Sequence, residues 1–210
     1  MARFDAKRIL NSVHNTAVFG RRVRVLAKAL ASAIPTRGTV LDLGSGDGSI
    51  AAALMQLRPD LKVEGVDVMV RPSTRIPVTA YDGNTLPFAD GSFDYVTIID
   101  VLHHTTDPAA VLTEAARVAR RAIVVKDHLL EGLLAGPTLR FMDWVGNRGH
   151  NVVLPYNYLN SEEWQGAFYQ AKLTTVSTVD HLHIYPVPFT FLFDRRLHFL
   201  AVLAPRGALQ

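Results

Sequence analysis

A short strand-like run that passes directly into a glycine-rich turn and a helix constrains the fold of this chain most. Residues 39–43 read TVLDL, a β-branched and apolar run, and residues 44–48 read GSGDG. The helical run SIAAALMQL follows at once over residues 49–57. A turn of this kind directs backbone N–H groups past the carboxyl end of its strand, where ligands bind in parallel sheets. The unit therefore predicts a ligand site at this turn.

Strand and helix patterns alternate along the rest of the chain. Further strands are predicted over residues 62–67, 76–81, 93–99, 122–126, 173–179 and 197–203. A helix is predicted over residues 107–120, with Asp107 as its N-cap and Pro108 in its first turn. Asn160 and Glu163 form the pattern of a capping box at the start of another helix. Because parallel strands need long crossover connections, this alternation predicts an α/β fold with helices on both faces of a parallel sheet.

The absence of cysteine and the modest length narrow the possible function classes. A chain of 210 residues fits one domain, and zero Cys excludes disulfides, thiol catalysis, iron–sulfur clusters and Cys-based zinc sites. No stretch approaches the roughly 18 uninterrupted apolar residues of a membrane span. The N-terminus also lacks the apolar block of a secretory signal. We therefore expect a cytoplasmic protein with no membrane partner.

Basic residues are concentrated at the N-terminus. Residues 1–38 hold eight Lys or Arg against Asp5 alone, a net charge of +7, whereas the remainder of the chain carries −4. We expect this segment to form one helix over residues 5–15 and a second that ends before Pro35, together an N-terminal helical lid of the same domain. A basic leader can bind nucleic acid or an anionic membrane. No aromatic residues interleave with the charges, which favours a solvated helix face.

Acidic residues distinguish the glycine-rich turn from a dinucleotide-binding turn. The turn reads Gly-x-Gly-x-Gly, whereas the dinucleotide fingerprint has its third Gly one position later. Asp42 in the preceding strand and Asp47 in the turn disfavour a pyrophosphate and suit a cation. Asp67 ends the second strand 19 residues after Gly48, where its carboxylate can accept hydrogen bonds from both hydroxyls of a ribose. These features argue against a nicotinamide-dependent oxidoreductase.

Several motifs in order relate the chain to a known family. VLDLGSGDG at residues 40–48, GVDV at 65–68 and YDGNTLPFADGSFDYVTIIDVLHH at 81–104 resemble the first to fourth motifs of the class I S-adenosylmethionine-dependent methyltransferases. TEAARVAR at 113–120 continues the likeness, which covers about residues 38–127. Two departures are Ser45, where the family often has Cys, and residues 120–122, where it often has Pro-Gly-Gly.

The resemblance implies a fold and a cofactor. The expected fold class is α/β, a doubly wound, mostly parallel seven-stranded sheet of Rossmann-like type with an antiparallel last strand. The core spans residues 39–210, with substrate-side insertions at about 129–159 and 180–196. S-adenosylmethionine is the implied cofactor.

The resemblance also implies which residues bind that cofactor. They are Asp42, Gly44, Ser45, Gly46, Asp67, Val68, Asp82, Gly83 and Asp100. The glycine turn would line the methionine part, whose ammonium group Asp42 would hold directly or through water. Asp67 would take the ribose hydroxyls, Asp82 the adenine amino group, and Gly83 would offer backbone beside the ring. Asp100 would face the methionine part or the substrate mouth. For each of these carboxylates, the alternative is a role as a turn cap.

Histidines are the candidates for catalysis. Methyl transfer is an in-line displacement in which positioning matters most, and a general base is needed only if the acceptor holds a proton. His104, four residues past Asp100, is the first candidate base, His103 the second, and His128 the third. The alternative for each is a packing or capping role.

Other side chains lie outside the matched motifs. Arg21 and Arg22 could clamp the cofactor carboxylate, with surface solvation as the alternative. His181 and His183 share one side of an extended segment, but no carboxylate cluster completes them, so no metal site is predicted. Four aromatic residues either line a substrate pocket or pack within a lid: Phe141, Trp144, Tyr156 and Tyr158.

The sequence predicts an enzyme that methylates a small molecule, because the two insertions supply enough chain for an enclosed apolar pocket. One alternative is a nucleic-acid or protein methyltransferase that docks through the basic leader. Another is a non-catalytic S-adenosylmethionine-binding regulatory protein. The sequence does not choose among O-, N-, C- and S-methylation, or fix the oligomeric state.

Overall fold

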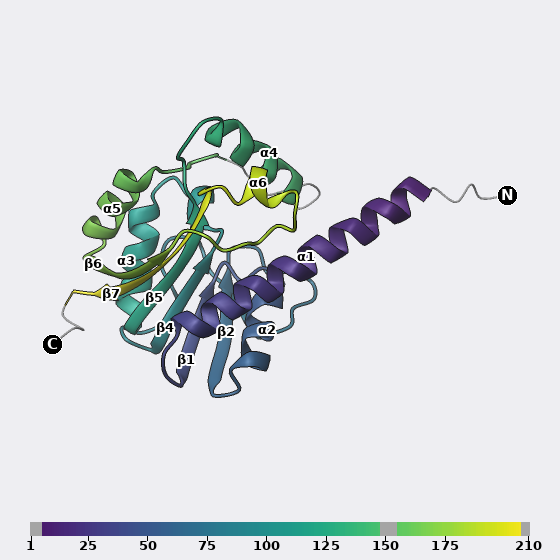
Figure 1. The fold of residues 1–210 in the computed structure, drawn as a ribbon. Helices are drawn as coiled ribbons and strands as arrows, with labels where there is room; N and C mark the ends of the chain where they lie inside the picture. Colours follow the sequence, from purple (N-terminus) through teal and green to yellow (C-terminus); the bar gives the residue numbers. More distant parts are fainter. Residues whose placement is uncertain (1–5, 148–154, 207–210) are drawn as a thin grey trace.

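The computed structural model describes residues 6–147 and 155–206, which form one seven-stranded sheet with helices on both faces (Figure 1). The strands are β1 Gly38–Leu43, β2 Leu61–Asp67, β3 Val78–Ala80, β4 Phe93–Ile99, β5 Ala119–His128, β6 Leu173–Val179 and β7 His198–Pro205. Their order in the sheet is β3-β2-β1-β4-β5-β7-β6. The first five strands pair in parallel, and β7 is antiparallel to both β5 and β6. The predicted fold class is confirmed.

Helices cover the sheet in two layers. The helices are α1 Ala6–Ala33, α2 Ser49–Leu57, α3 Pro108–Val118, α4 Ala135–Asn147, α5 Ser161–Gln170 and α6 Thr190–Phe193, with a short 3₁₀ helix, η1, at Leu102–His104. The C-terminal half of α1 and all of α2 cover one face, and α3 and α5 cover the other (Figure 1). α4 and α6 lie beyond the carboxyl ends of the parallel strands (Figure 1). None of the helices in the described ranges is long and apolar enough to cross a membrane.

The central strands explain why both faces are covered. β4 reads FDYVTII and is buried along almost its whole length. Tyr95 packs into the core cluster under α1 and α2, whereas Val96 packs into the cluster under α3 and α5. A strand that buries both of its faces needs a helical layer on each side, which is the reason for its continuous apolar run.

Several element boundaries differ from the sequence prediction, most clearly in three elements. The two predicted N-terminal helices are one continuous helix, α1, of 28 residues. The third strand is only Val78–Ala80, because only those residues pair with β2. β5 begins at Ala119 and ends at His128, since it pairs with β4 from Phe93 onward and with β7 as far as His198. The capping box of Asn160 and Glu163 is confirmed, with both hydrogen bonds present.

Candidate active site

The predicted site residues meet at the carboxyl edge of the parallel strands. Asp42 lies opposite Thr97 in the register of β1 and β4, and Ile99 lies opposite Lys126 in that of β4 and β5. The turns and loops that follow β1, β2, β4 and β5 therefore emerge side by side, as parallel pairing requires. This edge carries the glycine turn, Asp67, Asp100 and the His103–His104 pair.

The glycine turn leaves room for a ligand at one position and packs tightly at another. Gly44 and Gly46 have φ angles of +73° and +59°. A Cβ atom on Gly44 would lie 2.3 Å from Cγ2 of Val101, so this residue seals the turn against the loop after β4. A Cβ atom on Gly46 would have nothing within 4 Å. The open space beside Gly46 fits a bound group that approaches the backbone closely.

Asp67 and Ser45 fix the shape of this turn. The two carboxylate oxygens of Asp67 accept hydrogen bonds from the backbone N–H of Gly46 at 2.8 Å and of Met69 at 2.9 Å. The side chain of Ser45 points inward, toward Gly65. Its Oγ atom lies so close to Gly65 that a Cβ atom added there would be only 2.3 Å from it. Ser45 can therefore offer backbone more readily than its hydroxyl to a ligand. The carboxylate of Asp67 keeps further lone pairs for one.

Asp42 is a buried carboxylate that a cationic ligand would suit. Its Oδ1 atom accepts a hydrogen bond from Oγ1 of Thr97 at 2.7 Å. Burial raises the pKa of Asp42 to about 6, against the effect of this hydrogen bond, and the charge of Asp67 adds to the rise. Within the described part of the chain no Lys, Arg or His forms an ion pair with Asp42. An ammonium group bound nearby would favour the ionised carboxylate.

The residues predicted to hold adenine form an exposed edge. One carboxylate oxygen of Asp82 accepts backbone hydrogen bonds from Asn84 at 2.8 Å and Thr85 at 2.9 Å, so this side chain does cap a turn. Val68 is an exposed apolar residue, and a Cβ atom on Gly83 would lie 3.3 Å from its Cγ1 atom. The apolar side chain and the glycine backbone thus lie next to each other. Their role in adenine binding stays a prediction.

Asp100 is held by two cations. Nη2 of Arg22 lies 2.5 Å from its Oδ2 atom, and Nζ of Lys126 donates a hydrogen bond to its Oδ1 atom. Burial alone would raise the pKa of Asp100, but the charges of Lys126 and Arg22 hold it well below its usual range. Arg21 instead donates to the main-chain oxygens of His183 and Ile184. Both arginines predicted to reach a cofactor carboxylate are therefore engaged in contacts within the chain.

His103 is buried between two carboxylates. Its Nδ1 atom lies 2.6 Å from Oδ1 of Asp127, and its Nε2 atom lies 3.3 Å from Oδ1 of Asp143 on α4. Burial opposes protonation, but these carboxylates, Asp127 first, raise the pKa of His103 to about 10. An imidazole that is already protonated at neutral pH cannot accept a proton. The geometry thus argues against His103 as the base.

His104 has the properties that a base requires. Burial and the positive charge of His103 lower the pKa of His104, so its imidazole is neutral at pH 7. Its Nδ1 atom is buried and has no hydrogen-bond partner, and its Nε2 atom lies 3.9 Å from Oδ1 of Asp143. The side chain retains access to solvent, unlike that of His103. A neutral imidazole with a free ring nitrogen at the carboxyl edge can accept a proton.

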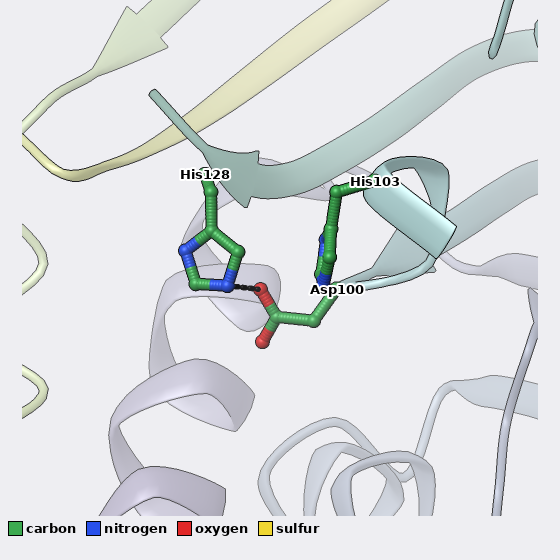
Figure 2. A group of neighbouring side chains, drawn as sticks. All are labelled: Asp100, His103 and His128. Carbon is green, nitrogen blue, oxygen red and sulfur yellow. Dashed lines mark ion pairs between the residues drawn. The ribbon is translucent and has the colours of Figure 1, made fainter. Parts of the chain in front are cut away.

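His128 and His198 are, like His104, neutral imidazoles. Figure 2 shows His103 and His128 on the two sides of Asp100, with Nε2 of His128 3.9 Å from its Oδ1 atom. Burial, with the charge of Lys126, holds the pKa of His128 and of His198 well below the usual range. Each has one buried ring nitrogen without a partner. His128 is enclosed more deeply than His104, so it ranks below His104 as a base.

Lys126, Asp127, Asp143 and His198 belong to this site, although the sequence prediction did not name them as site residues. Lys126, Asp127 and His128 are three consecutive polar residues that follow the apolar run AIVV of β5, and that break in the pattern is a signal the sequence does hold. Asp143 carries no comparable signal, because it reaches His103 across 40 residues of chain. His198 meets Lys126 only through the pairing of β5 with β7.

Two groups of side chains lie close enough to hold a metal ion, namely Asp100 with His103 and His128, and His103 with His104 and Asp143. Both include His103, whose two ring nitrogens already face carboxylates. Lys126 already provides a cation to Asp100. The arrangement therefore suits an internal network of charges better than a metal site. His181 and His183 belong to no such group among the described residues.

The four aromatic residues do not form one enclosed pocket. Tyr158 is buried and donates a hydrogen bond from its hydroxyl to Oδ2 of Asp143 at 2.8 Å. Tyr156 lies beside Tyr158, with the guanidinium of Arg140 over its ring. Phe141 and Trp144 are about half exposed on α4. Phe141 contacts the rings of Trp144 and Phe193, which fits packing within a lid, and a role of this pair in lining a substrate pocket stays a prediction.

Comparisons with known proteins relate part of the chain to methyltransferases. Residues 41–122 match the family model of the methyltransferase domain. Demethylmenaquinone methyltransferase from Roseiflexus castenholzii is 38% identical over 131 residues, which are 58% of this chain and 54% of the relative. 27-O-demethylrifamycin SV methyltransferase from Amycolatopsis mediterranei is 33% identical over 128 residues, 53% of this chain and 47% of the relative. The chain thus spans about half the length of these curated relatives.

A solved structure shares the fold. The crystal structure of a SAM-dependent methyltransferase from Aquifex aeolicus superposes with a TM-score of 0.61 at 17% identity. The match covers 87% of this chain and 92% of that chain. At this identity the similarity shows the fold alone.

Proposed function

We propose that this chain is a class I S-adenosylmethionine-dependent methyltransferase that transfers a methyl group from S-adenosylmethionine to a small-molecule acceptor. The observation that carries this proposal is the position of a neutral, unpaired imidazole, His104, at the same edge as the glycine turn. Val101, three residues before His104, packs against Gly44 and joins the two parts of the site.

The cofactor would lie along the glycine turn. S-adenosylmethionine supplies a methyl group on a positively charged sulfur, activated for transfer to a nucleophile. The free lone pairs of Asp67 suit the ribose hydroxyls, and the buried carboxylate of Asp42 suits the ammonium group of the methionine part. The open space beside Gly46 lets the cofactor reach the backbone. These side chains bind and orient, and positioning is the larger part of the catalysis of methyl transfer.

His104 would take a proton from the acceptor. Asp143 faces Nε2 of His104 and therefore favours the tautomer that carries the ring proton on Nε2. In that tautomer Nδ1, which has no hydrogen-bond partner, is the atom that can accept a proton. The positive charge of His103 keeps the His104 ring neutral before the reaction. An acceptor that carries a hydroxyl or another protonated nucleophile therefore fits this site.

A small-molecule acceptor is favoured over a macromolecule. The two curated relatives are named for demethylmenaquinone and for 27-O-demethylrifamycin SV. In addition, α4 and α6 lie beyond the carboxyl edge, where they can contact a small acceptor (Figure 1). N-terminal residues Arg21 and Arg22, which a nucleic-acid substrate could use, are engaged with His183, Ile184 and Asp100.

Replacing Asp67 by alanine is expected to weaken S-adenosylmethionine binding by about 1.5 to 3 kcal/mol, the range for hydrogen bonds to a charged group. Asp67 would lose its contacts to the ribose together with its hydrogen bond to Gly46. Isothermal titration calorimetry with S-adenosylmethionine, S-adenosylhomocysteine and a nicotinamide dinucleotide measures the affinities.

Asp60→Ala is the matched control, because Asp60 lies at the opposite end of the same strand and pairs with Arg58. We expect this variant to bind S-adenosylmethionine as the parent does. Unchanged affinity in folded Asp67→Ala would show that the ribose lies elsewhere. Binding of the dinucleotide alone would overturn the proposed function.

A further inference from the structure

An exposed apolar surface lies over α4 and the segment before and around α6. Nine large apolar side chains there, which we call the apolar face, are 44–81% exposed: Leu133, Leu134, Phe141, Trp144, Val145, Val187, Phe189, Phe191 and Leu192. They come from two segments, residues 131–145 and 180–196, which are far apart in the sequence. Together they account for much of the exposed large hydrophobic surface of the described residues. Exposed large apolar side chains that gather on one part of a protein usually mark an interaction site.

Contacts between the two segments make this surface continuous. The rings of Phe141 on α4 and Phe193 on α6 are stacked with centroids 6.4 Å apart. Nη2 of Arg195 donates to Oγ1 of Thr138 on α4 at 3.3 Å. Figure 1 shows α4 and α6 next to each other beyond the carboxyl edge of the sheet. The two segments that carry the apolar face are therefore packed against each other.

Basic side chains come from the same two segments as the apolar face, namely Arg140, Arg195 and Arg196. Of the acidic residues there, Asp143 and Asp194 are buried and hydrogen-bonded inside the protein, and Glu131 pairs with Arg196 at 3.8 Å. Asp180, at the start of the segment of residues 180–196, is a further acidic residue. The accessible charge around the face is thus mainly positive.

The N-terminal helix adds to this surface. Arg21 on α1 donates to the main-chain oxygens of His183 and Ile184, which fastens α1 to the segment that carries α6. Phe19, one residue before Gly20, is exposed on the same helix, and Arg24 follows one turn later. Arg21 therefore ties α1 to the segment that leads into the apolar face.

We propose that the apolar face docks on the surface of an anionic lipid bilayer. Aromatic and aliphatic side chains enter the boundary between headgroups and acyl chains, while arginines around them bind the lipid phosphates. A second copy of the chain fits this face less well, because two such faces would bring the same arginines together. The sequence expectation of no membrane partner rested on the absence of an apolar span, and a surface contact needs none.

Co-sedimentation with phosphatidylcholine vesicles, with and without phosphatidylglycerol, tests this proposal. The parent should bind the anionic vesicles and release as salt is added, since screening weakens the attraction of arginines to the lipid. The double variant Val187→Ser, Phe191→Ser, at positions 74% and 75% exposed, should bind at least about tenfold more weakly. Both positions are exposed, so the fold should survive.

The double variant Leu57→Ser, Val176→Ser is the matched control, because these residues are 47% and 56% exposed on other surfaces. It should bind vesicles as the parent does. Leu133→Ser, at an 81% exposed position before α4, is the second test variant if the first pair does not fold. Calorimetry with S-adenosylmethionine should give the same affinity for all variants, which separates this proposal from the proposed function.

Three results would overturn the proposal. One is a parent that leaves anionic vesicles unbound at low salt. Another is equal loss of binding in the test and control variants. The third is a concentration-dependent dimer, seen by analytical ultracentrifugation, that Val187→Ser, Phe191→Ser abolishes while vesicle binding stays intact, because the face would then belong to a second copy.

Discussion

Replacing His104 by alanine is expected to lower kcat about 10²- to 10⁴-fold while leaving the affinity for S-adenosylmethionine unchanged. The reason is that His104 offers a neutral ring nitrogen without a partner at the carboxyl edge, whereas His103 is held protonated by Asp127 and Asp143. Steady-state kinetics across pH, together with calorimetry for the cofactor, measures both quantities.

His181→Ala is the matched control, since His181 is an exposed histidine outside the charge network. Its kcat should equal that of the parent. A fall in both kcat and cofactor affinity for His104→Ala would mean that His104 supports the loop. A folded His104→Ala enzyme with full turnover and the pH profile of the parent would exclude His104 as the base and turn attention to His128.

Replacing Asp127 by asparagine is expected to destabilise the fold by about 3 to 5 kcal/mol, the range for breaking a buried ion pair. Asp127 is fully buried, and its carboxylate accepts from Leu102 N at 3.0 Å and His128 N at 2.7 Å as well as facing His103. The amide would leave the charge of His103 only partly compensated. Urea unfolding at neutral pH measures the loss.

The same variant should change how stability depends on pH. The pKa of His103 is raised from its ordinary value of 6.5 to about 10 in the folded chain. The stability that this proton contributes is therefore complete below pH 6.5 and is lost as the pH rises toward 10. The parent should lose stability between these limits, and Asp127→Asn should lose much less of it. Asp60→Asn, at an exposed pair with Arg58, should follow the parent. Equal pH dependence in all three proteins would contradict a protonated His103.

The strands and the glycine turn were predictable because their signals are local. TVLDL is β-branched and apolar over consecutive residues, and GSGDG supplies the φ angles that the turn needs. The capping box of Asn160 and Glu163 is equally local, since both hydrogen bonds close within one helical turn. Signals of this kind need no knowledge of the tertiary structure.

The charge network was only partly predictable because its members meet through tertiary structure. The sequence indicated His103, His104 and Asp100 from one stretch of chain. It gave no indication that Asp143 would reach His103 or that Lys126 would reach Asp100. Those contacts depend on how α4 and β5 lie against the loop after β4, and they decide which histidine is neutral.

The continuity of α1 shows the same limit at the level of secondary structure. Gly20 lies inside the helix, although glycine costs about 1 kcal/mol there. The apolar stripe of Leu26, Leu30 and Ile34 packs fully into the core and fixes the C-terminal half. Once that half has formed, each further residue adds to an existing helix, and propagation costs far less than nucleation.

The most direct test of the central claim is transfer of a labelled methyl group. The protein is incubated with S-adenosylmethionine that carries a trideuteromethyl group and with a fractionated cell extract, and mass spectrometry identifies the labelled products. The account predicts a labelled small molecule whose formation requires the parent enzyme and falls with His104→Ala. Label found only in nucleic acid or protein, or tight cofactor binding with no labelled product at all, would contradict it.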